Sequence, residues 1–136
     1  AETVVSAKLD GSDPRTIDLS ANLDVPRGIG IDSAERRMYV VNTGSATITR
    51  ANLDGTGAVV LGLGGTLDLP YDIALDTVSR TMYVTNYGDN TVVSADLDGS
   101  APTKHTLGGL LDRPYGIALL SAFPARLEPP PRDWLP

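Results

Sequence analysis

Three loops of the chain each place an aspartate two positions before a proline. The aspartates are Asp24, Asp68 and Asp112, and they recur at an interval of 44 residues. If the loops converge, such carboxylates could attract a basic peptide or a cation, because Ca²⁺ prefers several hard oxygen ligands. Alternatively, each aspartate caps its own turn by accepting hydrogen bonds from nearby backbone amides.

The residues directly after the three prolines are large and polar, namely Arg27, Tyr71 and Tyr115. Tyrosine and arginine dominate the binding hot spots of protein interfaces. These positions therefore predict a binding face, with local packing as the alternative. The turn that follows a nearby predicted strand extends this candidate face with Tyr87, Asp89 and Asn90.

Other repeated polar residues favour a structural role. Asn42 and Asn86 each end a predicted strand, where a short amide side chain can tie neighbouring backbone segments together. Asp32 and Asp76 each precede an arginine by four residues, so Arg36 and Arg80 are their expected partners.

The sequence contains no recognisable catalytic constellation. His105 is the only histidine, there is no cysteine, and no His, Asp and Glu set has metal-ligand spacing. A single histidine in a predicted outer strand does not suit a Ser-His-Asp arrangement. We therefore assign no catalytic residue, metal or cofactor. The sequence favours a protein without catalytic activity but does not decide the point.

The architecture follows from an internal repeat. Asp-Gly, the strongest short hairpin signal, occurs at Asp10-Gly11, Asp54-Gly55 and Asp98-Gly99, again 44 residues apart. Short apolar segments with turn signals every eight to twelve residues indicate an all-β fold. A period near 44 with four strands per unit is typical of β-propeller blades, which must stack to bury their faces.

Each unit is expected to contain four short antiparallel strands. Within a unit the first of them follows the proline, and the Asp-Gly turn joins the last two. The predicted strands are 28–32, 72–76 and 116–120 for the first, 37–42 and 81–86 for the second, 3–8, 47–52 and 91–96 for the third, and 15–19, 58–63 and 103–107 for the fourth.

The segment PRGIGIDSAERRMYVVNTGSATITRANLDGT resembles the YWTD repeat of LDL receptor class B propellers, and also the bacterial YVTN-type repeat. Tyr39-Val-Val-Asn42 and Tyr83-Val-Thr-Asn86 stand at the signature positions, without its Trp and with Asn for the final Asp. The resemblance covers roughly residues 3–120. It implies four-stranded blades, six per ring in the YWTD group, used mainly for binding at an extracellular or cell-surface location.

Composition narrows the range of partners. The formal net charge is −6, which argues against nucleic acid or an anionic membrane surface. No apolar run approaches the length of a transmembrane helix.

The last segment, 121–136, is rich in proline and is expected to be extended, either as a linker or as a docking ligand for an aromatic groove.

The predicted organisation is a partial blade at 1–25, full blades at 26–69 and 70–113, a lone inner strand at 114–120 and the tail at 121–136. About three units cannot close a ring, because propellers have 4–8 blades. The chain is therefore expected to form a homodimer that completes one six-bladed ring, or to be a fragment of a longer chain.

The function expected from these observations is a non-catalytic binding or assembly module. The channel-mouth face of the propeller would hold a protein segment or a glycan. The alternatives are part of a propeller enzyme, such as a metal-dependent lyase or lactone hydrolase, and a purely structural or engineered repeat fragment.

Overall fold

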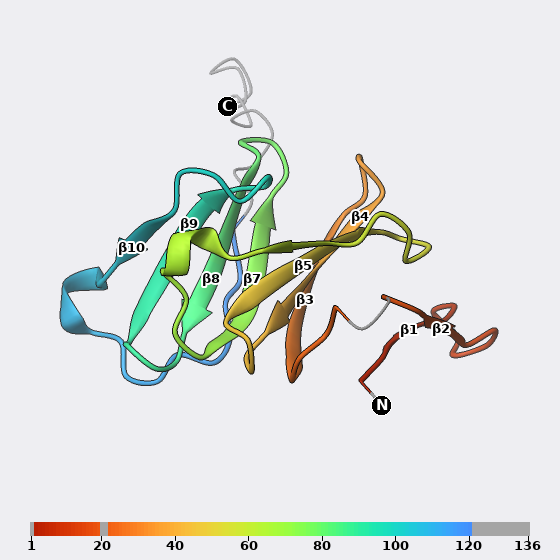
Figure 1. Ribbon diagram of the computed structural model, residues 1–136, viewed down its shortest axis with the longest axis horizontal. Coiled ribbons are helices and arrows are strands. Elements are labelled where there is room, and N and C mark those ends of the chain that lie inside the picture. The colour runs from red at the N-terminus through yellow and green to blue at the C-terminus, as the bar shows by residue number, and fades with distance from the viewer. Residues whose placement is uncertain (1, 20–21, 121–136) are drawn as a thin grey trace, which may run out of the picture.

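The computed structural model describes residues 2–19 and 22–120, so the tail predicted at 121–136 lies outside the described residues. Two four-stranded antiparallel sheets lie next to each other, and a two-stranded hairpin lies beyond the first (Figure 1). Within each sheet the strands pair in chain order. This is the blade topology that the repeat predicts.

No helix among the described residues is long and apolar enough to cross a membrane.

The strands of the two sheets occupy equivalent positions in the two repeats. The hairpin consists of β1 (Val4–Ser6) and β2 (Arg15–Ile17). The first sheet contains β3 (Pro26–Asp32), β4 (Arg37–Asn42), β5 (Thr47–Asn52) and β6 (Val59–Leu61). The second contains β7 (Pro70–Asp76), β8 (Thr81–Asn86), β9 (Thr91–Asp96) and β10 (Thr103–His105).

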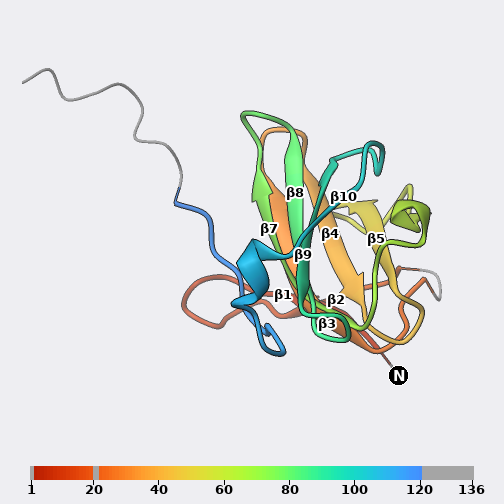
Figure 2. The same ribbon diagram turned by 90° about the vertical axis from the view of Figure 1, so that its left-hand side faces the viewer.

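The second and third strands of both full blades match the predicted bounds, whereas the fourth strands are shorter than predicted. Two 3₁₀ turns, η1 (Leu63–Gly65) and η2 (Leu107–Gly109), follow β6 and β10. Leu63 and Leu107 have left-handed φ angles of 45° and 46°. This conformation breaks the extended ladder, and η2 lies at the outer edge of the second sheet (Figures 1 and 2).

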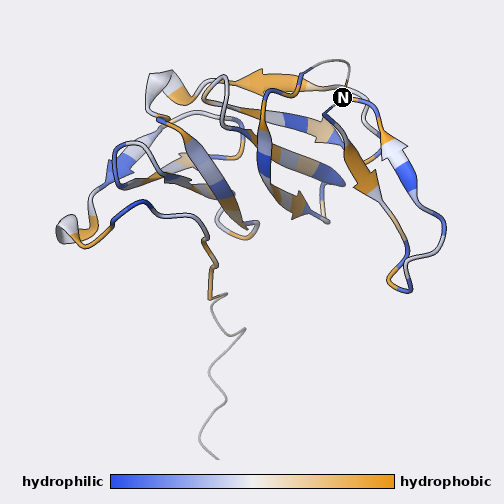
Figure 3. Ribbon diagram, turned by 90° about the horizontal axis from the view of Figure 1, so that it is seen from below, coloured by the Kyte–Doolittle hydropathy of each residue, from blue (hydrophilic) through white to orange (hydrophobic). Residues whose placement is uncertain are grey.

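Apolar side chains cover both faces of the second strand in the first blade, as the nearly continuous apolar sequence there predicts. Tyr39 and Val41 face the second blade, in a cluster that includes Met82 and Val84 of β8. Met38 and Val40, which alternate with them along the strand, face the N-terminal hairpin. Polar and apolar bands alternate along the strands in Figure 3. The first blade is therefore stabilised by a neighbour on either side, the second blade and the hairpin.

The Asp-Gly turns have the same hydrogen bonds in each repeat. The carboxylates of Asp54 and Asp98 accept bonds from the backbone N–H groups of Thr56 and Ser100 at 2.9 Å. Gly55 and Gly99 both have φ of 90°, which residues with a side chain rarely adopt. The dipeptide is thus required by the loop geometry between the third and fourth strands.

The inner strand predicted within residues 114–120 is wrong, because no strand forms there. It lies beside the second blade, and Ile117 N–H donates to Asp72 Oδ2 at 3.1 Å. A β-ladder needs backbone partners, and no second strand of a third unit is present among the described residues to supply them.

The two blades are joined by polar contacts that cross from one repeat to the next. The expected pairs Asp32–Arg36 and Asp76–Arg80 do not form among the described residues. Instead, Arg80 Nη1 lies 2.6 Å from Oδ2 of the fully buried Asp32 in the neighbouring blade. Thr43 Oγ1 similarly donates to the carbonyl of Pro70 at 2.5 Å. The arginine lies one repeat plus four residues after its aspartate, so the pair connects two blades.

Asn42 and Asn86 tie the incoming connection to their own blade. Asn42 Nδ2 donates to Thr49 Oγ1 at 2.8 Å, and its Oδ1 accepts the N–H of Asp24 at 3.2 Å. Asn86 makes the equivalent bond to Asp68 at 3.2 Å and donates to the carbonyl of Thr66 at 2.9 Å. Both side chains are buried, which agrees with the structural role predicted for them.

Replacement of Asn42 by alanine should lower the free energy of unfolding by about 2–3 kcal/mol, because several buried partners lose their hydrogen bonds together. Urea unfolding at pH 7 measures this change. Asn52→Ala is the matched control, since Asn52 is exposed and its side chain bonds only Thr56 among the described residues. Equal effects of the two variants would contradict a special role for Asn42.

Stability should depend on pH through Asp32. Burial alone would raise the pKa of Asp32, but the Arg80 hydrogen bond and the N–H of Glu35 hold that pKa below its ordinary value. The pKa is therefore lower in the folded than in the unfolded state. The stabilisation is present above the unfolded value of about 3.9 and is lost as pH falls through the folded pKa.

Arg80→Gln should lower the unfolding midpoint at pH 7 and reduce the further loss between about pH 4 and pH 2. Thermal unfolding followed by circular dichroism at several pH values measures both effects. Arg36→Gln, which changes the equivalent arginine of the first blade, should leave the acid dependence unchanged. If the unfolding midpoints of the wild type and of Arg80→Gln differed by the same amount at every pH, the link between Asp32 and Arg80 would be contradicted.

A candidate binding face at the tyrosine cluster

Three predicted site residues contact one another at one end of the second blade. Tyr71, Tyr87 and Tyr115 form what we call the tyrosine cluster, with ring centroids 5.6 Å apart for Tyr71 and Tyr87, 4.7 Å for Tyr71 and Tyr115, and 5.2 Å for Tyr87 and Tyr115. Tyr71 and Tyr115 meet edge to face at 84°. These separations and this orientation are favourable for aromatic pairs.

Two arginines flank the tyrosine cluster. The guanidinium carbon of Arg27 lies 4.9 Å from the ring centroid of Tyr71, and that of Arg113 lies 5.8 Å from the centroid of Tyr87. Both distances suit cation–π attraction. Arg27 was expected at this face, whereas Arg113 was not, because it lies before its proline and only its fold position brings it to Tyr87.

A shallow cleft of about 310 Å³ lies beside the tyrosine cluster. Its walls come from the same two positions of three consecutive repeats. The first position supplies Arg27, Tyr71 and Tyr115, and the second supplies Gly28, Asp72 and Gly116. Gly28 permits the close approach, since a Cβ at this position would lie 2.6 Å from Asp72 Cα. The repeat thus brings three distant residues to one surface.

Asp72 holds Tyr115 and its neighbours in place, although it was not among the predicted site residues. One carboxylate oxygen accepts the N–H of Ile117, and the backbone N–H of Asp72 donates to Thr85 Oγ1 at 3.0 Å. The Thr85 hydroxyl in turn donates to the carbonyl of Tyr115 at 3.1 Å. The available signal was the departure from the repeat, because the equivalent positions are Gly28 and Gly116.

The tyrosine hydroxyls interact as well as the rings. Hydrogen bonding to Tyr87 raises the pKa of the Tyr115 hydroxyl above its ordinary value. Tyr115 is nevertheless 56% exposed. Tyr115 therefore presents a neutral hydroxyl group and accessible aromatic surface to a ligand.

The three loop aspartates do not all have one environment. The Asp24 carboxylate lies against Gly44, and the Asp68 carboxylate lies against Gly88, each in the next turn of its own blade. Asp112 is exposed. Within the described residues no three His, Cys, Asp or Glu side chains gather in a way that could hold a metal ion. This placement supports the local role of the aspartates over a converging ring.

The other two predicted residues of the turn have local partners. Asp89 forms an ion pair with Lys104 of β10 and accepts a bond from Thr91 Oγ1 at 2.6 Å. Burial would raise the pKa of Asp89, but these two partners hold it below its ordinary value. Asn90 Oδ1 accepts the N–H of Arg113 at 2.8 Å. Both side chains therefore order the loops around the tyrosine cluster.

Comparison with known proteins supports the fold. The chain is similar to a chain in the crystal structure of the nidogen/laminin complex, with 27% sequence identity and a TM-score of 0.66 over 75% of the present chain and 39% of the other. The present chain thus spans well under half of that chain. No family model and no curated protein matches the sequence. The structural likeness supports a YWTD-like β-propeller fold.

Proposed function

We propose that the chain is a non-catalytic binding module whose ligand lies on the tyrosine cluster. The observation that carries this proposal is the contact of Tyr71, Tyr87 and Tyr115 beside a cleft, with Arg27 and Arg113 over two of the rings. Packed aromatic and arginine side chains are enriched in binding hot spots. Hydrogen bonds from Thr85, Asn90 and Asp72 to the backbone hold the loops around the cluster, so little ordering is needed when a ligand binds.

The ligand class that suits this surface best is a protein segment with apolar and acidic side chains. The tyrosine rings offer apolar area, and the two arginines offer charge-assisted bonds to carboxylates. The structural neighbour comes from a complex whose title names two proteins, nidogen and laminin, which fits a protein partner. A glycan is the second class to be screened, because sugar rings also stack on aromatic faces.

Replacement of both Tyr71 and Tyr115 by alanine should weaken capture of a ligand selected from peptide and glycan arrays by about 30-fold or more, as expected for loss of hot-spot residues. Surface plasmon resonance measures the change. The Tyr71→Phe and Tyr115→Phe pair keeps the rings and should retain most of the affinity. Val78→Ala, at an exposed turn outside the cleft, is the control.

Retained affinity in the double alanine variant would remove the tyrosine cluster from consideration. A folded double variant is a condition of the test, and near-ultraviolet circular dichroism verifies it. Capture of glycans with no capture of peptides would overturn the protein-segment assignment while keeping the site.

We further propose that the chain forms a homodimer. A second copy would cover the open blade faces, so that two half-rings complete one six-bladed ring. Ile29 and Ile31 on β3 are 46% and 50% exposed, although they belong to an inner strand. A second copy that covers this strand would remove both side chains from water.

The mass in solution tests this assembly directly. Light scattering on a sizing column should give the mass of two chains, and Ile31→Asp should shift the protein towards one chain by placing a charge in the covered apolar surface. Ile31→Val keeps this surface apolar and should preserve the pair. A wild-type mass of one chain at all concentrations would contradict the second copy as the partner.

A further inference from the structure

The tail at 121–136 contains a short segment whose composition matches the ligand class proposed for the tyrosine cluster. Residues 127–131 read Leu-Glu-Pro-Pro-Pro, with apolar side chains next to one carboxylate, and they contain the only run of three prolines in the chain. Consecutive prolines favour the polyproline II conformation, which aromatic-lined grooves bind because it is already ordered. These residues lie outside the described part of the chain, whereas the site that they suit lies within it.

The rings of the tyrosine cluster form the walls of a groove and not a flat stack. Tyr71 and Tyr115 meet at 84°, and Tyr87 and Tyr115 meet at 58°, so the ring faces diverge. One proline ring can therefore lie against one aromatic face while the next contacts another. Tyr71 and Tyr115 also line the shallow cleft of about 310 Å³ beside the cluster.

Arg27 supplies the positive charge that an acidic residue next to the prolines would need. Its side chain lines the same cleft and lies over the ring of Tyr71, with 4.9 Å between the guanidinium carbon and the ring centroid. Arg27 is exposed, and within residues 2–19 and 22–120 it forms no ion pair. Its guanidinium can therefore donate charge-assisted hydrogen bonds to a carboxylate while it stays over the ring.

The chain is anchored beside this cleft just before the described part ends at Leu120. The Thr85 hydroxyl donates to the carbonyl of Tyr115, and the N–H of Ile117 donates to Asp72 Oδ2, both at 3.1 Å. Asp72 itself lines the cleft. The segment that leads into the tail therefore starts at the site.

The length of chain after this anchor is sufficient for a return to the site. Glu128 follows Ile117 by eleven residues, which can span up to about 36 Å when extended. Closing a loop of this length costs little more free energy than closing a shorter one, and a short tether gives an effective concentration in the millimolar range. A weak contact is therefore enough to fill the cleft, which favours the chain's own tail over a free segment of the same composition.

We propose that residues 127–131 of the tail bind the tyrosine cluster of their own chain. The prolines at 129–131 lie against the faces of Tyr71 and Tyr115, and the Glu128 carboxylate accepts hydrogen bonds from Arg27. This inference rests on the proposed function, because it concerns the same site, and it adds a means of regulation. An external ligand has to displace the tail before it can bind.

Trp134, the single tryptophan of the chain, makes tail binding measurable without an external ligand. It follows the last of the three prolines by three residues, so it lies within about 10 Å of the bound segment. Energy transfer from tyrosine to tryptophan falls steeply with distance. Excitation of the tyrosines in the full chain should therefore give Trp134 emission, and replacement of the prolines at 129–131 by alanine should remove most of this transfer. Pro124→Ala is the matched control within the tail and should retain it.

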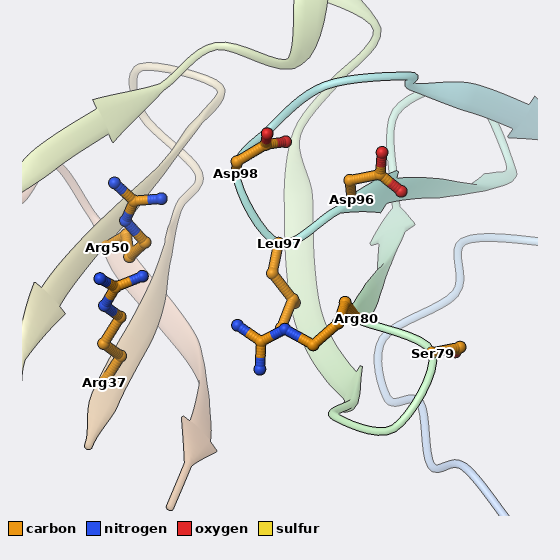
Figure 4. A pocket seen from close by; sticks show the side chains of 7 residues that line it. All are labelled: Arg37, Arg50, Ser79, Arg80, Asp96, Leu97 and Asp98. Carbon is orange, nitrogen blue, oxygen red and sulfur yellow. The ribbon is translucent and has the colours of Figure 1, made fainter. Parts of the chain in front are cut away.

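Arg27→Gln tests the site from the other side without removing a tyrosine, and it should also lower the transfer to Trp134. Arg37→Gln is the matched control. Arg37 lines a second cleft, of about 440 Å³, together with Arg50 and Arg80 (Figure 4). That cleft lies at the other end of the second blade, because Arg80 directly precedes β8 and Tyr87 follows it. Arg37→Gln should leave the transfer unchanged.

An external ligand provides a separate measurement. The chain with alanine at 129–131 should bind the array-selected ligand at least about threefold more tightly than the wild type, because a site that is occupied for two thirds of the time shows one third of its affinity. Unchanged transfer in that variant, or an equal loss in Arg37→Gln, would overturn the tail as the occupant while leaving the external ligand in place. Transfer that rises with protein concentration would assign the bound tail to a second copy and contradict binding within one chain.

Discussion

The structure depends on the packing of one sheet face against the next. A strand such as β4, with Tyr39 and Val41 on one face and Met38 and Val40 on the other, cannot bury its side chains within a single blade. Stacking removes both faces from water, and burial of each large apolar side chain is worth about 1.5–3 kcal/mol. The repeat of 44 residues is therefore a physical necessity, since an isolated unit lacks the second face.

Polar contacts between blades then fix how the stacked faces are aligned. Apolar packing is not directional, whereas the Asp32–Arg80 pair and the Thr43 bond to the Pro70 carbonyl each accept only one arrangement. Both contacts lie at the ends of strands, one at each end of the interface between blades. Together they set the angle at which the second sheet meets the first, and this angle brings Tyr71 and Arg27 together.

Much of the fold was predictable because the relevant signals are local and repeated. The Asp-Gly turns and the signature segments fix the second and third strands to the residue. Contacts between repeats were harder to predict. The partner of Asp32 was sought four residues along the chain, but the pair spans one repeat more. The strand predicted at 116–120 failed for a related reason, because extended sequence alone does not supply a ladder partner.

The candidate site was predictable where it follows the repeat and was missed where it departs from it. Tyr71, Tyr115 and Arg27 share one repeat position, so their common surface could be foreseen. Asp72 and Arg113 gain their importance only from contacts with Ile117 and Tyr87.

Positions that are identical in both blades maintain the fold, as Asn42 and Asn86 do by bonding the same loop in each repeat. Positions that differ, such as Arg37 and Thr81 or Gly28 and Asp72, are free of that requirement. Comparison of a repeat with itself therefore separates structural residues from candidate binding residues within a single sequence. The cleft beside the tyrosine cluster is lined in part by residues of the second kind, since Arg27 and Gly28 hold the positions of Tyr71 and Asp72.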